Sequence, residues 1–315
     1  MAAVRSALTL PRGRSLASLL VALALTCAAA PAAEAKPILG IAEQQAGAYG
    51  TALFQDLGVR HARLNLAWDV FEYDWQVAQL DAWMAATQAA GVKPLVIFSQ
   101  SRVKERTRRI PTPAQFGAVV DRLRERYPWL NEFATWNEAN YEGQPTARNP
   151  QKVAALYRTL RRHCTGCTIA AAALLDNAQL IPYATGLRRA IRRLGLPDPK
   201  LWALHNYIDV NNLRDRSTQA LLKSVQGRVW ITETGGVVRA TSRNAKKFKQ
   251  GPARAAKVLK YILGPLVKRN PRITRIYVYC FNGEAPPASW DSGLIAPDGS
   301  PRPAYTVLKK ALASG

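Results

Sequence analysis

Residues 94–99, Pro-Leu-Val-Ile-Phe-Ser, form an apolar run that ends in a polar side chain. A nearly unbroken apolar run of this length is typical of a strand in a parallel sheet, because helices cover both faces of such a sheet. The polar residue at the end of the run marks where the strand leaves the core. The stretch therefore predicts a parallel β-sheet flanked by helices.

Similar runs recur on both sides of this stretch, and an amphipathic segment follows each of them. Alternation of this kind indicates parallel strands joined by crossover helices, and eight units favour a closed barrel. An open dinucleotide-binding sheet would carry a glycine-rich loop after its first strand, which residues 42–47 do not provide. We therefore expect an α/β fold, a single (β/α)8 TIM barrel. The expected strands are 38–42, 59–66, 94–99, 133–137, 168–174, 201–207, 229–233 and 273–281, and the expected helices are 46–57, 77–90, 112–127, 150–163, 183–194, 214–225, 252–269 and 304–313.

The N-terminal segment has the composition of a secretory signal peptide. Its opening is basic, residues 16–30 are apolar, and residues 33–35 form a small-x-small cleavage site. The apolar run is too short to span a bilayer comfortably, and an uncleaved anchor is the alternative. We expect residues 1–35 to be the signal peptide and residues 36–315 the catalytic domain of a secreted protein, with no membrane span after signal removal.

The chain carries a formal charge of +23, which favours contact with nucleic acid, acidic polysaccharide or an anionic cell envelope. A platform for nucleic acid would mix aromatic rings with its cations. Here the basic residues gather on predicted helices and in the cluster of Lys246, Lys247 and Lys249, with few aromatics between them. We expect no nucleic-acid partner. A solvated basic surface and electrostatic association with the cell envelope both remain open.

The cysteines indicate one disulfide. Cys164 and Cys167 form a C-x-x-C, and Cys280 lies inside an apolar run. A close pair of this kind in an oxidising compartment favours a local disulfide. A redox motif or half of a zinc site is the alternative, but the chain has no second pair and only His163 lies nearby in sequence. We expect a Cys164–Cys167 disulfide, a buried Cys280 thiol and no metal.

Two of the predicted strands end at a glutamate. The run from Phe133 leads to Asn137-Glu138, and the run from Val229 leads to Glu233. The active site of a (β/α)8 barrel lies at the carboxyl ends of its strands, so both carboxylates are expected at one mouth. Two carboxylates hydrolyse a glycosidic bond when one protonates the leaving oxygen and the other attacks the sugar or activates water. The pair predicts a glycosidase.

Further polar and aromatic residues lie at the ends of other strands. Arg63 and Tyr207 can keep Glu233 ionised, which suits a nucleophile, whereas Glu138 is expected to keep its proton. Asn137 is suited to bind a sugar 2-hydroxyl. Structural roles remain open for three of these residues. Arg63 can form a structural ion pair, His205 can be a core histidine, and Trp68 can cover the barrel rim. The other candidates for contact with sugar are His205, Phe281, Trp290 and Trp68.

This pattern resembles the large clan of retaining (β/α)8 glycoside hydrolases, the cellulase and β-xylosidase-like superfamily. Asn137-Glu138 on the fourth strand and Glu233 on the seventh are similar to the acid/base and the nucleophile of the clan. Arg63 and the pair His205-x-Tyr207 match further clan positions, and the resemblance spans nearly all of residues 36–315.

The C-terminal part carries one departure from the clan pattern. Residues 290–294 and 301–305 are similar to the last loop and last helix of the clan. Many members have a tryptophan at the end of the eighth strand, where this chain has Phe281. Either Phe281 or Trp290 is expected to form the floor under the sugar, which leaves the substrate class open.

The resemblance implies a secreted, retaining glycoside hydrolase that acts on a β-linked poly- or oligosaccharide without a cofactor. It implies a covalent glycosyl-enzyme on Glu233, with Glu138 acting first as acid and then as base. Two alternatives are a non-catalytic carbohydrate-binding barrel and a basic envelope-associated protein that binds anions through its surface. The sugar, the linkage and the choice between endo and exo cleavage stay open.

Overall fold

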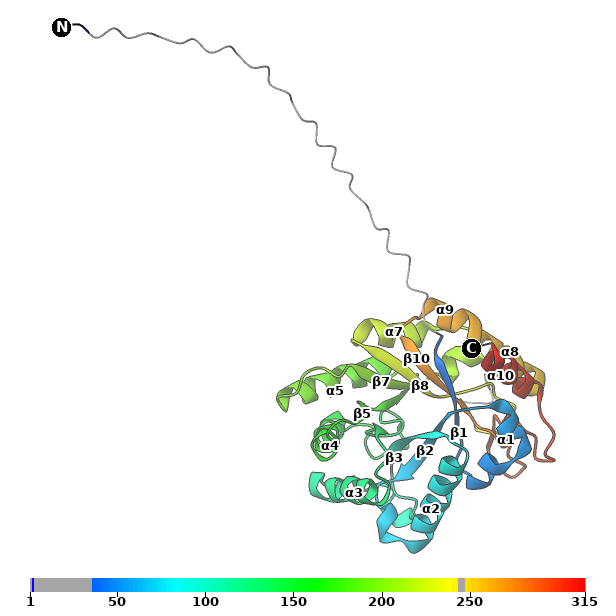
Figure 1. Cartoon of the computed structure of the whole chain (residues 1–315), viewed down its shortest axis with the longest axis horizontal. Helices are drawn as coiled ribbons and strands as arrows, with labels where there is room; N and C mark the ends of the chain where they lie inside the picture. The colour runs from blue at the N-terminus through cyan, green and yellow to red at the C-terminus, as the bar shows by residue number, and fades with distance from the viewer. Residues whose placement is uncertain (1, 3–35, 243–246, 315) are drawn as a thin grey trace. The chain divides into compact units, whose positions relative to one another are not determined.

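The computed structural model describes residues 2, 36–242 and 247–314 (Figure 1). The expected signal peptide and Lys246 of the basic cluster lie outside these residues. Within the described part of the chain, no helix combines the length and the apolar character needed to cross a bilayer.

The centre of the domain is one sheet in which every neighbouring pair of strands is parallel. Its order is β5-β4-β3-β2-β1-β10-β8-β7-β6. Figure 1 shows these strands in the middle of the domain with the helices outside them. The strands are β1 (Ile38–Ala42), β2 (His61–Ala67), β3 (Lys93–Ser99), β4 (Glu132–Ala134), β5 (Thr168–Ala170), β6 (Ala173–Leu175), β7 (Leu201–His205), β8 (Arg228–Thr234) and β10 (Ile273–Tyr279).

The sheet closes on itself because β5 and β6 are two halves of one barrel position. β5 pairs with β4, and β6 pairs with β7. Two hydrogen bonds connect the two halves to both neighbours. The amide of Ala171, between β5 and β6, donates to the carbonyl of Leu201 on β7 at 3.1 Å, and the amide of Ala173 on β6 donates to the carbonyl of Trp136, after β4, at 2.9 Å. The nine strands therefore occupy eight barrel positions, which confirms the predicted (β/α)8 barrel and adds a break in the fifth strand.

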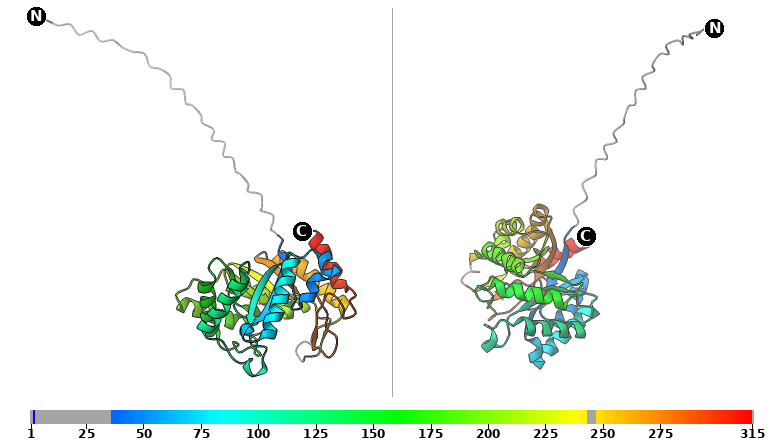
Figure 2. Two further views of the ribbon diagram at one scale, coloured as in Figure 1. Left: turned by 60° about the horizontal axis from the view of Figure 1, so that its bottom comes forward. Right: turned by 90° about the vertical axis from the view of Figure 1, so that its left-hand side faces the viewer.

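The helices alternate with the strands as predicted, and Figure 2 shows them packed along the outside of the barrel. The predicted start at Thr112 is a capping box: its hydroxyl accepts from the amide of Gln115 at 3.2 Å, and its own amide donates to the Gln115 side chain at 2.9 Å. The helices are α1 (Ala52–Leu57), α2 (Asp74–Ala89), α3 (Pro113–Arg126), α4 (Pro150–His163), α5 (Leu180–Arg193), α6 (Tyr207–Asn211), α7 (Arg216–Ser224), α8 (Pro252–Tyr261), α9 (Val267–Arg269) and α10 (Pro303–Ala313).

Two predicted helices are interrupted in the structure. The one expected over residues 46–57 is a 3-10 turn followed by α1, because extended Thr51 separates them and caps α1. The one expected over residues 252–269 passes through a π-helical turn between α8 and α9. Pro265 lies in this turn, where its ring and its missing amide hydrogen disfavour a regular α-helix.

The core has two layers. Small and branched side chains fill the barrel interior together with Trp230 and Tyr277, and a larger apolar layer lies between the strands and the helices. A buried ion pair joins Arg275 of β10 to Glu132 of β4 inside the barrel, and the Arg275 guanidinium lies 3.9 Å from the ring centre of Trp230. The apolar and paired residues hold the strand ends that carry the candidate site.

Glu43, just after β1, ties the first strand to the last. One carboxylate oxygen accepts the amides of Gln44 at 2.8 Å and Gln45 at 2.9 Å, and the other accepts those of Phe281 at 3.1 Å and Asn282 at 3.0 Å. The side chain is 3% exposed. Burial raises the pKa of Glu43, although these four hydrogen bonds act against the rise. The carboxylate therefore fixes the seam between β1 and β10.

Replacing Glu43 by glutamine is expected to destabilise the fold. The side-chain nitrogen of glutamine cannot accept hydrogen bonds, so two of the four backbone N–H groups would be left buried and unpaired, at a cost of about 1–3 kcal/mol. For a domain of this size each kcal/mol corresponds to a fall in melting temperature of roughly 2–4 °C. Thermal unfolding of Glu43→Gln and of the exposed control Glu105→Gln measures the effect. Equal melting temperatures for the two variants would contradict a role of Glu43 in the seam.

Candidate active site

Glu138 lies at the carboxyl end of β4, held by backbone hydrogen bonds on both sides. The amide of Asn137 donates to the carbonyl of Phe98 on β3 at 2.7 Å, and the amide of Ala139 donates to the carbonyl of Ala173 on β6 at 3.0 Å. Glu138 has φ +44°, a left-handed conformation that is uncommon for residues other than glycine. Such a backbone costs of order 1–3 kcal/mol and is found preferentially at functional sites.

Glu233 lies near the end of β8 and accepts hydrogen bonds from two other elements. Arg63 of β2 donates to Oε2 at 2.7 Å, and the hydroxyl of Tyr207 donates to Oε1 at 3.1 Å. Burial raises the pKa of Glu233, but the positive charge of Arg63, the electrostatic effect of His205 and the hydrogen bonds of Tyr207 and Arg63 outweigh it, so the pKa is below its usual value. The site therefore favours an ionised Glu233.

His205, the last residue of β7, lies between the two glutamates. Its Nδ1 is 3.1 Å from Oε1 of Glu138 and 3.7 Å from Oε2 of Glu233, and the ring is fully buried. Nδ1 can donate to an ionised carboxylate or accept from a protonated one. The contact with Glu138 therefore suits both of its protonation states. His205 and Glu233 are also partners in register across β7 and β8.

The two carboxylates face each other across a short gap. One oxygen of Glu138 lies within 4.8 Å of one oxygen of Glu233, and the side chains are 21% and 14% exposed. Both are therefore open enough to meet a ligand and close enough to act on opposite sides of one bond.

Asn137 and Trp290 join the same site from other directions. The Asn137 side chain accepts a hydrogen bond from the Arg63 guanidinium, which also binds Glu233. Trp290 belongs to a two-stranded ribbon of β9 (Arg239–Ala240) and β11 (Trp290–Asp291). Its ring meets the ring of Tyr207 edge-on at 5.1 Å between centres. The structure thus gathers four predicted residues around Glu138 and Glu233 or their direct partners, namely Arg63, Asn137, His205 and Tyr207, and Trp290 contacts Tyr207.

Phe281 does not join them. Its side chain is 1% exposed and packs against Phe54 of α1, with ring centres 5.4 Å apart. The strand β10 ends at Tyr279, two residues earlier than predicted, so Phe281 lies beyond the strand end at which it was expected. The expectation that Phe281 forms a sugar floor is therefore wrong. Trp68 is also buried, 2% exposed, and the Arg106 guanidinium lies 5.0 Å from its ring centre.

Tyr279, which was not among the predicted site residues, holds the strand-end position expected for Phe281. It is the last residue of β10 and is partly exposed. Burial and the nearby charge of Glu233 raise the pKa of Tyr279, which places its hydroxyl within the field of that carboxylate. The alternation of Tyr277 and Tyr279 along one strand was the available signal.

A metal is geometrically conceivable at Glu138, His205 and Glu233, whose ligand atoms lie within 4.8 Å of one another. The guanidinium of Arg63 already binds Glu233 at 2.7 Å, and its positive charge opposes a second cation at that oxygen. The donor set therefore fits acid–base chemistry better than a metal centre. Away from the site, Cys164 and Cys167 form the predicted disulfide with their Cα atoms 5.5 Å apart, and Cys280 is buried with a free thiol.

Asp176, after β6, positions the helical turn that begins with Tyr207. Its carboxylate accepts the amide of Ile208 at 3.1 Å and that of Asp209 at 2.7 Å. Burial raises the pKa of Asp176 to about 7; these hydrogen bonds oppose the rise and the charge of Asp209 adds to it. No local pattern predicts this role, because both partners are backbone amides 32 and 33 positions away in the chain.

The raised pKa of Asp176 predicts a pH-dependent stability. The folded state binds the Asp176 proton more tightly than the unfolded chain, so this contribution is complete below about pH 4 and is lost as pH rises through about 7. Asp176→Asn cannot ionise. Its free energy of unfolding relative to wild type should therefore rise by roughly 2 kcal/mol between pH 5 and pH 8 in urea titrations. A difference that stays constant with pH would show that Asp176 is ionised throughout.

Comparison with known proteins gives structural neighbours only: no family model and no curated protein matches the chain. A family 39 glycoside hydrolase from the gut symbiont Bacteroides cellulosilyticus WH2 matches with a TM-score of 0.56 and 18% identity, over 89% of this chain and 64% of that one. A glucosidase from Croceicoccus marinus matches with a TM-score of 0.65 and 13% identity, over 88% and 67%.

A native xylanase 10B from Thermotoga maritima matches over most of both chains, 88% of this one and 94% of that one, with a TM-score of 0.62 and 11% identity. At such low identity the likeness concerns the fold and not the site residues. The chain therefore has the (β/α)8 barrel fold that these glycoside hydrolases share.

Proposed function

We propose that the protein is a secreted, retaining glycoside hydrolase that cleaves a β-linked glycan by double displacement. The observation that carries the proposal is the pair of carboxylates from β4 and β8, with oxygens within 4.8 Å of each other. Retaining enzymes place their carboxyl groups about 5–5.5 Å apart, whereas inverting enzymes leave about 6.5–9.5 Å for a water molecule. The short gap supports direct attack by one carboxylate.

In the first displacement Glu233 is the nucleophile and Glu138 the acid. Arg63 and Tyr207 favour an ionised Glu233, which attacks the anomeric carbon while Glu138 passes its proton to the departing glycosidic oxygen. The bond between the anomeric carbon and Glu233 forms as the bond to the leaving oxygen breaks. As Glu233 gives up its charge, Arg63 remains bonded to Asn137, so the guanidinium keeps a partner.

In the second displacement Glu138 acts as a base. It removes a proton from water, whose oxygen attacks the anomeric carbon and releases Glu233 as a carboxylate. His205 lies beside Glu138 in this step, with Nδ1 3.1 Å from Oε1, and in its Nδ1–H tautomer it donates to the ionised carboxylate that takes the proton from water. Two inversions at one carbon give a product with the starting configuration.

The proposal also covers the substrate class and the location of the protein. The neighbouring folds include enzymes named as xylanases and a glucosidase, which makes xylan and β-glucans suitable first substrates. The basic, then apolar, N-terminal sequence and the Cys164–Cys167 disulfide support export to an oxidising compartment. Association with an anionic envelope stays a prediction that rests on the charge of +23.

Turnover by matched glutamate variants tests the proposal. The mature protein is assayed on neutral and acidic polysaccharides and on aryl glycosides. Glu233→Gln should lose at least about 10³-fold in rate on every substrate, because it removes the nucleophile. Glu138→Gln should lose about 10²–10⁴-fold on polysaccharides and less on aryl glycosides, whose leaving groups need no proton in the first step. The exposed control Glu142→Gln should retain full activity.

Two results would contradict the proposal. If no substrate is cut while wild type and Glu233→Gln bind the same glycan equally, the barrel is a carbohydrate-binding protein. If turnover occurs and survives both glutamate substitutions, the chemistry lies elsewhere.

The acid limb of the pH–rate profile is predicted to depend on Tyr207. Its hydroxyl donates to Glu233 and lowers the pKa of that carboxylate, so ionised Glu233 persists below the usual glutamate range. Tyr207→Phe removes the donor, which should raise the Glu233 pKa and move the acid limb of kcat/KM to higher pH. An unchanged acid limb, measured between pH 3 and 8, would assign that limb to a different group.

A further inference from the structure

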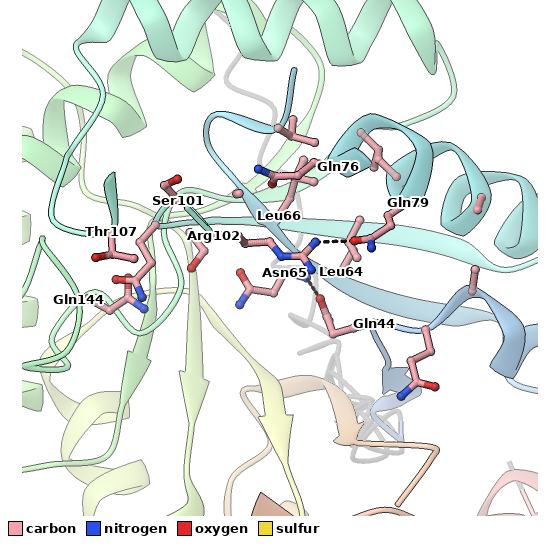
Figure 3. Close-up of a pocket in the computed structure, with 18 residues that line it drawn as sticks. Gln44, Leu64, Asn65, Leu66, Gln76, Gln79, Ser101, Arg102, Thr107 and Gln144 are labelled. Atoms are coloured by element: carbon pink, nitrogen blue, oxygen red, sulfur yellow. Dashed lines mark hydrogen bonds between the residues drawn. The ribbon is translucent and has the colours of Figure 1, made fainter. Parts of the chain in front are cut away.

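A pocket of about 860 Å³ lies at the same end of the barrel as the two glutamates, which are not among its lining residues. It is formed by the ends of β2 and β3, the start of α2 and the loops nearby (Figure 3). Two lining residues connect it to the site. Asn65 is two positions beyond Arg63 on β2, and the Gln144 side chain accepts from the indole of Trp136, two residues before Glu138, at 3.1 Å. A glycan held at the glutamates can therefore extend toward this pocket.

The wall of the pocket contains buried polar atoms that have no hydrogen-bond partner within the described part of the chain. They are Oδ1 of Asn65, Nε2 of Gln76 and Oε1 of Gln100. Gln76 is 2% exposed, so its amide is held in the wall and cannot turn out to bulk solvent. Buried polar groups left unpaired are costly, and sugar hydroxyls can both donate to and accept from these amides once the side chains turn toward the pocket. These amides indicate a site built for a polar ligand.

Arg102 is the one charged residue among those that line the pocket. Its guanidinium donates to Oε1 of Gln79 at 2.6 Å and lies 4.6 Å from the ring centre of Trp75. Figure 3 shows the side chain extending across the pocket to Gln79. Within residues 36–242 and 247–314, no carboxylate forms an ion pair with it. Of the five donors of a guanidinium, the hydrogen bond to Gln79 uses one, so the others can meet a ligand.

Two neighbouring arginines of the same loop have partners away from the pocket. Arg106 pairs with Glu72 and with Asp69, the latter at 3.4 Å. Arg108 donates to the carbonyl of Gly143 at 3.2 Å. Neither of them lines the pocket, whereas Arg102 does and is oriented there by an aromatic ring and a neutral amide.

We propose that this pocket is a subsite for an anionic sugar, with Arg102 binding the carboxylate or sulfate group and the amides binding hydroxyls. The inference rests on the proposed glycosidase function and names its substrate class: a glycan that carries an acidic residue next to the cleaved linkage. A guanidinium presents two parallel N–H donors that match a carboxylate or a sulfate. A pocket lined by amides without aspartate or glutamate adds no repulsion to such a group.

Binding of acidic and neutral glycans to the Glu233→Gln variant tests the subsite without turnover. The probes are β-linked oligomannuronate and glucuronoxylan fragments, a sulfated galactan fragment that carries no uronate, and the carboxyl-reduced forms of the first two. Arg102→Gln, added to Glu233→Gln, should weaken binding of the favoured acidic probe about 10- to 100-fold, because a hydrogen bond to a charged group contributes about 1.5–3 kcal/mol. Binding of the carboxyl-reduced probes should change less than about twofold.

Arg109→Gln is the matched control, since it removes the same charge from an exposed residue of the same loop that does not line the pocket. Arg102→Lys keeps the charge but loses the two parallel N–H donors of the guanidinium, so its affinity should lie between those of the Arg102 protein and Arg102→Gln. The acidic probe that loses affinity in the Arg102→Gln variant shows whether the pocket prefers a uronate or a sulfate.

Three outcomes would overturn the subsite. One is equal weakening by Arg102→Gln and Arg109→Gln with a steep salt dependence, which indicates non-specific attraction to the basic surface. Another is equal loss for the acidic and carboxyl-reduced probes, which indicates a structural role. The third is no binding of any acidic probe at low salt. These results leave the glutamate assays unaffected, so failure of the subsite and failure of the glycosidase proposal are distinguishable.

Discussion

The buried guanidinium of Arg63 is the interaction on which the rest of the site depends. The side chain is 1% exposed and joins three barrel positions, because it lies on β2, donates to Glu233 on β8 and donates to Asn137 after β4. A buried cation needs an anion nearby, and a buried anion needs a cation. Arg63 and Glu233 meet that requirement for each other, which fixes both the position and the charge of the proposed nucleophile.

The asymmetry between the two glutamates follows from this pair. Glu233 binds the Arg63 guanidinium and the Tyr207 hydroxyl, whereas the side chain of Glu138 contacts His205. One carboxylate is therefore surrounded by groups that favour its charge, and the other has a partner that accepts either protonation state. An acid and a nucleophile need this difference in environment, although both are glutamates.

Supporting contacts hold the elements that carry these groups. Glu43 fixes the seam where β1 meets β10, and Asp176 fixes the turn that starts with Tyr207. Both are buried carboxylates that accept hydrogen bonds from backbone amides, and neither is among the residues expected to contact substrate. The barrel mouth thus contains acids of two kinds, those that organise the backbone and those that face the gap.

The sequence predicted the barrel and most of the site because both follow from local patterns. Apolar runs ending in polar residues located the strands, and parallel strands bring their carboxyl ends together, which placed Arg63, Asn137, Glu138, His205 and Glu233 at one mouth. Prediction failed where an element ended earlier than its apolar run. Phe281 lies beyond the end of β10 and packs outside the barrel, and Tyr279 holds the position expected for it.

Other features had no local signal at all. Glu43 accepts amides that are 238 and 239 positions away in the chain, so no spacing rule finds it. Tyr207 was predicted to lie on a strand beside His205, but it opens a helical turn and reaches Glu233 from there. The break between β5 and β6 depends on hydrogen bonds to the neighbouring strands, which a single run of residues does not reveal.

The central claim is that Glu233 forms a covalent bond to the sugar, and trapping the intermediate tests it most directly. A 2-deoxy-2-fluoro glycosyl fluoride of the sugar that the enzyme cleaves slows both steps but leaves a good departing group, so the glycosyl-enzyme accumulates. A covalent bond between Glu233 and the sugar predicts that the mass of the peptide containing Glu233 increases by one fluorosugar, and that the peptide containing Glu138 is unchanged. Turnover of the natural substrate with no adduct and with an inverted product would contradict it.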